Sequence, residues 1–121
     1  MKIGVFRIHT GYSIDPAVFA KRAEELGFHS FWAAEHPILP VNVKTGFLGQ
    51  PGEPIPPIYG EIADPFIVLA RASAVTTRIK LGTGICLVPE RNPLLLAKEI
   101  ATLDHYSGGR FVFGVGAGWL K

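Results

Sequence analysis

The sequence has one cysteine, few charged residues and no long apolar run. Cys86 is the only cysteine among 121 residues, which excludes an internal disulfide and a closed zinc site built from several cysteines. Charged residues make up 18% of the chain, and the basic ones are scattered at a formal net charge of +2, so we expect no nucleic-acid partner. Polar residues interrupt every apolar stretch well short of a membrane span or a signal-sequence core. We therefore expect a cytoplasmic protein without a membrane partner.

Apolar residues, by contrast, are abundant. They make up 48% of the chain, which is enough for a substantial core and high for a free-standing chain of this length. A length of 121 residues fits one domain or part of one. We treat residues 1–121 as a single unit with a face that needs a partner.

Strand-like and helical segments alternate along the chain. Each helical segment begins at an Asx-Pro pair, at Asp15, Asp64 and Asn92, where the side chain caps free N–H groups and proline suits the first helical position. Because parallel strands need crossover connections, the order β-α-β-α-β-α-β predicts an α/β fold with a parallel sheet. The expected strands cover residues 2–8, 28–34, 79–87 and 111–113.

Two architectures with this order remain open. One is an open doubly wound sheet, and the other is a (β/α)8 barrel, of which four strands are half. Both place ligand sites at the carboxyl ends of the strands, where this sequence has His9, Glu35, His36 and glycine-rich segments. The glycines at 114, 116 and 118 do not form a dinucleotide fingerprint, because their spacing is not G-x-G-x-x-G.

The segment from about 37 to 63 interrupts the alternation with a composition rich in proline and glycine. Such a composition opposes both helices and sheet ladders, and a disordered linker is one interpretation. Apolar residues such as Phe47 and Tyr59 favour another, because a plain linker lacks such anchors. We expect an excursion that packs over a site.

Five short motifs occur in an order and at a spacing that are specific together. They are the Glu35-His36 pair, the 81–85 segment LGTGI, the 91–93 segment RNP, the 104–110 segment DHYSGGR and the 114–119 segment GVGAGW. Through them, essentially the whole chain resembles the luciferase-like monooxygenases, a family of (β/α)8 barrels that use a flavin or the deazaflavin F420.

The resemblance implies that residues 1–121 are the N-terminal half of a TIM (β/α)8 barrel, because a whole barrel takes about 250 residues. Half a barrel exposes unpaired strand edges, and we expect the inward faces of Val5, Phe31 and Leu81 to lack their opposite wall. Members of the family also dimerise through helices of this half. We therefore expect a homo-oligomer, most simply a two-fold dimer.

The resemblance also puts His36 at the position of the family's active-site histidine, near the reactive face of the cofactor ring. An imidazole titrates near neutral pH, so it can donate or accept a proton during hydride transfer. From the residues alone, a histidine that caps a strand and bonds the backbone is the alternative. The expected cofactor-binding residues are Glu35, Thr83, Gly84 and Ile85.

Several of these residues have a second interpretation. Family members have a non-proline cis peptide at the end of the third strand, which corresponds here to Gly84-Ile85, and an ordinary β-bulge is the alternative. Thr83 presents its hydroxyl to the cofactor or bonds a neighbouring carbonyl. Arg91 is interpreted as a solvated loop arginine rather than a ligand of an anionic cofactor tail, and Cys86 as a packing residue.

The leading function is the N-terminal portion of an F420- or FMN-dependent oxidoreductase or monooxygenase that acts on a small molecule. In the family, loops after later strands hold the cofactor phosphate, so we expect catalysis to require them. A non-catalytic truncated half-barrel that self-associates or binds a partner chain is the first alternative. A metal-dependent hydrolase using His9, Glu35 and His36 is the second, and the poor ligand spacing argues against a metal.

Overall fold

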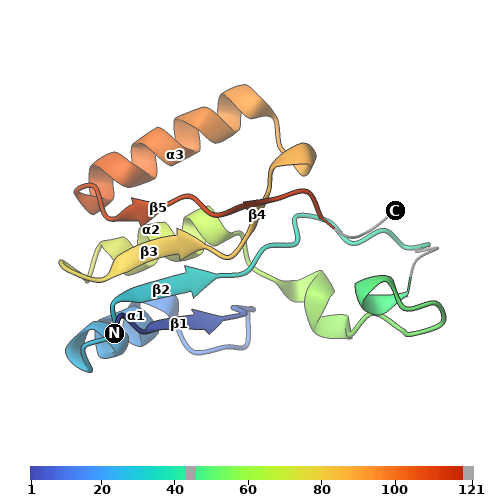
Figure 1. Cartoon of the computed structure of the whole chain (residues 1–121), viewed down its shortest axis with the longest axis horizontal. Helices are drawn as coiled ribbons and strands as arrows, with labels where there is room; N and C mark the ends of the chain where they lie inside the picture. The colour runs from blue at the N-terminus through green and yellow to red at the C-terminus, as the bar shows by residue number, and fades with distance from the viewer. Residues whose placement is uncertain (43–45, 119–121) are drawn as a thin grey trace.

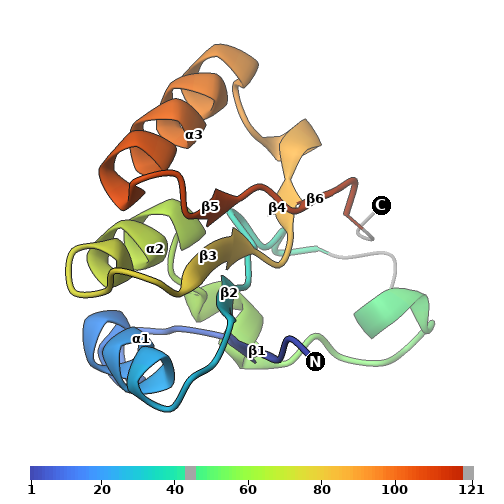
Figure 2. The same ribbon diagram turned by 60° about the vertical axis from the view of Figure 1, so that its left-hand side comes forward.

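The structure, a computed structural model, describes residues 1–42 and 46–118. Trp119, which ends the last motif of the sequence, lies outside the described residues. A parallel four-stranded sheet in the order β1-β2-β3-β5 carries three helices on one face (Figures 1 and 2). The elements of this layer pair are β1 Gly4–Arg7, α1 Pro16–Glu25, β2 Ser30–Ala33, α2 Pro65–Ser73, β3 Lys80–Thr83, α3 Pro93–Ser107 and β5 Phe111–Val112.

The helices begin where the Asx-Pro pairs predict. Asp15 Oδ1 accepts a hydrogen bond from the N–H of Ala17 at 2.8 Å, and Asp64 Oδ1 accepts one from the N–H of Phe66 at 2.9 Å. Asn92 caps α3 in the same way, through the N–H of Leu94 at 3.0 Å. Each cap satisfies a donor that has no partner within its helix. The predicted alternation of strands and helices is confirmed.

The predicted strand over residues 79–87 is wrong in its extent, because it is divided, and a further strand follows the last predicted one. The segment 79–87 forms β3 and then β4 Cys86–Leu87, with a break at the Gly84–Ile85 peptide bond, which is cis. The last predicted strand, 111–113, contains β5, and β6 Val115–Gly116 follows it outside the predicted range. Strands β4 and β6 pair with each other in a separate parallel ladder, in which Cys86 lies opposite Val115.

The sheet faces are the reverse of the expected ones. Val5, Phe31, Leu81 and Phe111 are aligned across the sheet, and all four pack into the core with the helices. Phe31 and Leu81 are completely buried there. The expectation that Val5, Phe31 and Leu81 face the barrel interior is therefore wrong.

The open face of the sheet carries the neighbouring residues along each strand. Phe6, Trp32, Gly82 and Val112 are aligned across the strands on this side. The indole of Trp32 extends over Gly82, where a Cβ would come within 2.3 Å of the ring. Phe6 is 58% exposed, so this apolar surface is uncovered by the described residues.

The excursion folds onto the carboxyl end of the sheet. It contains two short 3-10 turns, η1 Phe47–Gly49 and η2 Pro57–Glu61, and a third turn, η3 Val88–Glu90, leads into α3. The N–H of Ala63 donates a hydrogen bond of 2.8 Å to the carbonyl of His9, which fixes the end of the excursion beside β1. In Figure 1 the excursion projects beyond the strand ends.

Candidate functional site

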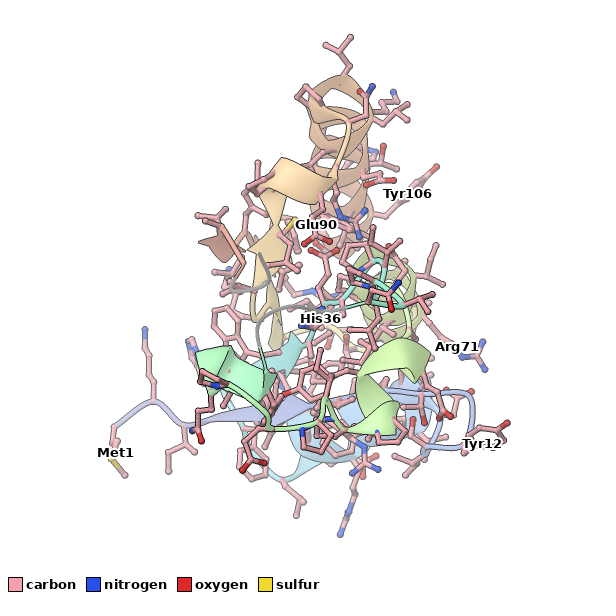
Figure 3. All side chains as sticks on the ribbon, turned by 90° about the vertical axis from the view of Figure 1, so that its right-hand side faces the viewer. Met1, Tyr12, His36, Arg71, Glu90 and Tyr106 are labelled. Carbon is pink, nitrogen blue, oxygen red and sulfur yellow. The ribbon has the colours of Figure 1, made fainter. Side chains whose placement is uncertain are left out.

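A cavity of about 410 Å³ lies at the carboxyl ends of the strands. Figure 3 views this end of the molecule, with His36 near its centre and Glu90 above it. The excursion supplies one group of the lining residues and the two strand ladders supply the rest. The lining consists of Phe6, Ile8, Ala34, Glu35, His36, Tyr59, Ile62, Gly84, Ile85, Leu87, Ala117 and Gly118.

His36 follows β2 and meets an aromatic side chain of the excursion. The ring of Tyr59 lies edge-on to the imidazole, with centroids 5.1 Å apart and an angle of 72° between the planes. Phe47 contacts the same tyrosine at 5.2 Å and 71°. The arrangement puts an imidazole beside a largely apolar cavity.

Glu35 is buried beside His36 and is bound by groups of the chain itself. Its side chain is fully enclosed and accepts hydrogen bonds from the guanidinium of Arg91, including one from Nε at 2.7 Å. The N–H of Leu87, in β4, donates to the other carboxylate oxygen. Glu35 therefore links the end of β2 to the strand that follows the Gly84–Ile85 bond.

Arg91 is the centre of this ionic cluster. Besides Glu35 it binds Asp64 at 2.6 Å and Glu99 at 3.2 Å, and its guanidinium lies 4.8 Å from the ring centroid of Phe66. Burial alone would lower the pKa of Arg91, but the hydrogen bonds to Glu35 and Asp64 raise it above its ordinary value. The interpretation of Arg91 as a solvated loop arginine is wrong, since only 13% of its side chain is exposed.

The other predicted cofactor residues separate into two groups. Gly84 and Ile85 line the cavity, and the cis form of the bond between them is the one that the resemblance implies. Thr83 is completely buried, and its hydroxyl donates to the carbonyl of Gly114 at 2.8 Å and accepts from the N–H of Gly114 at 3.0 Å. The structure thus places the Thr83 hydroxyl against the segment that joins β5 to β6, and Thr83 is not among the residues that line the cavity.

His9 lies apart from His36 in a mainly apolar environment. Its ring contacts Phe19 and Phe31 edge-on, at 5.8 and 5.4 Å, and Ser13 Oγ lies 3.4 Å from Nδ1. Its Nε2 is buried without a hydrogen-bond partner among the described residues. Burial, followed by the charge of Arg7, lowers its pKa.

Metal coordination finds no support in the part of the chain that the structure describes. Among residues 1–42 and 46–118, no three His, Cys, Asp or Glu side chains are placed to hold a metal ion. His9, Glu35 and His36 are not brought together as ligands, because Glu35 is bound by Arg91. Within the same ranges, no helix has the length and apolar character needed to cross a bilayer.

Cys86 behaves as the packing residue that the sequence predicts. Its side chain is completely buried. Burial raises the pKa of its thiol to about 12, and the nearby Glu35 carboxylate adds to the rise. A thiol with this pKa is almost entirely protonated near neutral pH and is a poor nucleophile.

The contacts of two residues near the site were not predicted from the sequence. Tyr59 comes from a segment without secondary-structure periodicity, and its apolar character was the only available signal. Arg91 reaches Glu35 across 56 positions of sequence, so no local spacing could indicate the pair. The sequence identified the two ends of this pair, but not their contact.

Comparison with known proteins agrees with this architecture. The sequence matches the family described as luciferase-like monooxygenase over residues 8–121. An uncharacterized protein of Mycobacterium tuberculosis (strain ATCC 25618 / H37Rv) is 41% identical over 124 residues, a match that covers 98% of this chain and 43% of that protein.

Two solved structures show the same half-barrel arrangement. The oxygenating constituent of 3,6-diketocamphane monooxygenase from Pseudomonas putida, solved in complex with FMN, has a TM-score of 0.72 and 25% identity. The coenzyme F420 dependent tetrahydromethanopterin reductase from Methanopyrus kandleri has a TM-score of 0.71 and 31% identity. The matches cover 98% and 97% of this chain, but 30% and 27% of those chains. The chain thus spans less than half the length of each of these relatives.

Proposed function

The chain belongs to the luciferase-like monooxygenase family, and on that basis we propose that it is the N-terminal part of a flavin- or F420-dependent oxidoreductase. The observation that carries the proposal is His36 at a mainly apolar cavity on the carboxyl end of a parallel sheet. Ligands bind at this end of the strands in both barrels and open α/β sheets.

The cavity suits a planar ring system better than a charged tail. Its volume of about 410 Å³ lies in the range of small-molecule sites. Gly84, Ile85, Ala117 and Gly118 offer a surface of small and aliphatic groups against which a ring can lie. Among the described lining residues there is no lysine or arginine to hold a phosphate, so that contact is assigned to later parts of a longer protein.

Within this proposal, His36 is the catalytic residue, because its imidazole can take up or release a proton next to the bound ring. A bound flavin or deazaflavin supplies the hydride chemistry. Glu35 acts by holding the end of β2 against β4, and Thr83 by holding the Gly114 segment. The FMN complex and the F420-dependent enzyme among the structural relatives support both cofactors equally.

A fluorescence titration of the purified 121-residue protein with FMN and, separately, with F420 tests the proposal. We expect saturable binding that His36→Ala weakens by about tenfold, which corresponds to about 1.4 kcal/mol. The matched control is His29→Ala, because His29 is exposed and lies before β2, at the opposite end of that strand from His36. The absence of FMN and F420 binding to a well-folded protein would contradict the placement of the cofactor ring against the described residues of this chain.

The uncovered sheet face favours a second candidate function, a half-barrel that associates with a second copy of itself. Phe6 and Val115 are 58% and 57% exposed, and neither β1 nor β5 has a second neighbour among the described strands. Two copies joined edge to edge around a two-fold axis would cover these apolar groups and pair the open edges. Light scattering tests this candidate: a protein that stays monomeric at high concentration contradicts it.

A further inference from the structure

The excursion holds Tyr59 as a fixed wall of the His36 cavity. Its ring is placed between His36, at 5.1 Å, and Phe47, at 5.2 Å. Two backbone hydrogen bonds order the segment around it: the N–H of Phe47 donates to the carbonyl of Glu53 within the excursion at 2.9 Å, and the N–H of Ala63 donates to the carbonyl of His9 at 2.8 Å. Tyr59 is therefore part of the cavity's shape.

The described lining of the cavity has no lysine or arginine to pair with an anionic ligand. Apart from the Tyr59 phenol, the described lining side chains that ionise are Glu35 and His36. The carboxylate of Glu35 is already bound by Arg91 and by the N–H of Leu87. An anionic group in this cavity would lose part of its hydration without gaining a lysine or arginine partner among the described lining residues, which is unfavourable.

We propose that the substrate of this site is an uncharged, largely apolar molecule that lies against Tyr59, and that Tyr59 is a specificity-determining residue. This inference rests on the proposed function and names the substrate class for the same site. In this arrangement the substrate lies against Tyr59 and Ile62 and the cofactor ring against Gly84 and Ile85, all four of which line the cavity. The substrate has one polar atom, such as a carbonyl oxygen, which lies toward His36.

Two probes of similar size separate the alternatives. Cyclohexanone is uncharged, and cyclohexanecarboxylate is an anion with the same ring size. Their binding to the 121-residue protein is measured by protein-observed NMR, with the resonances of His36 as the readout, in the presence and absence of FMN or F420. We expect cyclohexanone to bind at least about tenfold more tightly than the carboxylate.

The variants locate the contact. Tyr59→Ala is expected to weaken cyclohexanone binding by about fivefold or more, while Tyr59→Phe retains the ring and binds like the wild type. Ile58→Ala is the matched control, since Ile58 lies in the same turn and is 43% exposed. The unfolding midpoint of each variant shows whether its fold is retained.

Each outcome has one meaning. The inference is overturned if cyclohexanone does not bind, if the carboxylate binds as well, or if a folded Tyr59→Ala binds cyclohexanone like the wild type. Loss of cyclohexanone binding in both Tyr59→Phe and Ile58→Ala also overturns it, because the turn as a whole would then be responsible. If cyclohexanone binding depends on Tyr59 but neither cofactor binds, the placement of the cofactor ring in this cavity fails, while an apolar ligand site at Tyr59 stands.

Discussion

The guanidinium of Arg91 donates a hydrogen bond of 2.7 Å from Nε to the buried carboxylate of Glu35. This contact joins the end of β2 to the turn before α3, and Asp64 extends it to the start of α2. A guanidinium suits the position because its planar fork can bind several carboxylates at once. The cluster therefore joins the end of β2, the turn before α3 and the start of α2.

Removing this arginine should strongly destabilise the fold. Arg91→Ala leaves Glu35 buried without its cation, and we expect the free energy of unfolding to fall by roughly 3–5 kcal/mol in urea denaturation. Arg91→Lys should recover only part of this loss. The control is Arg22→Ala, whose exposed pair with Glu25 contributes less than about 1 kcal/mol. Equal effects at the two arginines would refute the structural role of Arg91.

Arg110 should be equally intolerant of substitution, for a different reason. Its nearly buried guanidinium has no carboxylate in hydrogen-bond contact among the described residues and instead donates to acceptors in Ser73, Thr76, Ile79 and Ser107, at 2.7–3.1 Å. Burial lowers its pKa.

We expect Arg110→Met to reduce the free energy of unfolding by at least about 2 kcal/mol, since several buried acceptors lose a charged donor. Arg110→Lys should restore little of it, because a point charge cannot reach all these acceptors. The exposed Arg78 offers the matched control, Arg78→Met. Thermal and urea unfolding measure both, and a loss in Arg110→Met no larger than the control's would contradict the prediction.

The stability of the protein should fall as the pH decreases from 7 to 5.5, in part because of His9. Burial and the charge of Arg7 lower its pKa below 6.5, while the carbonyl of Ile14 and the carboxylate of Asp15 partly oppose them. The unfolded chain therefore takes up this proton first on acidification. The stabilisation is complete above the unfolded pKa and is lost as the pH falls through it toward the folded one.

The dependence is measured as the free energy of unfolding at several pH values. His9→Phe should flatten the curve between pH 7 and 5.5, whereas His29→Phe, at an exposed position, should not. If the free energy of unfolding of His9→Phe changes with pH as steeply as that of the wild type, His9 is not the source of the pH dependence.

Cys86 should resist alkylation in the native state. Its thiol is completely buried, with a pKa of about 12, so the reactive thiolate is scarce at pH 8. Iodoacetamide labelling followed by mass spectrometry should be at least about a hundredfold slower in native protein than in urea. Rapid labelling of the native protein would show that the segment around β4 opens readily.

The elements of the fold could be predicted from local sequence, but the directions of their side chains could not. The caps at Asp15 and Asp64 act within three residues of themselves, so their chemistry is visible in the sequence. The two faces of the sheet are both apolar, with Phe31 on one and Trp32 on the other, so alternation carries no information about which face meets the helices.

Part of the candidate site could also be predicted from the sequence. His36, Gly84 and Ile85 follow strands directly, and the parallel order brings strand ends together, so their place beside one cavity follows from the pattern. Thr83 lies just before Gly84 and Ile85 in the sequence, yet its hydroxyl is hydrogen-bonded to Gly114. The difference depends on how β3 ends, which no spacing of residues indicates.

The sequence by itself determined the α/β order, the helix starts and the family, because each depends on contacts or motifs within a few residues. Only the tertiary structure decided that Arg91 binds Glu35, that Tyr59 lies against His36 and that Trp32 lies on the open face over Gly82. These contacts join residues brought together by packing across strands and loops. Arginines, carboxylates and aromatic residues occur at many positions of the sequence, and only the geometry of the folded chain decides which of them come into contact.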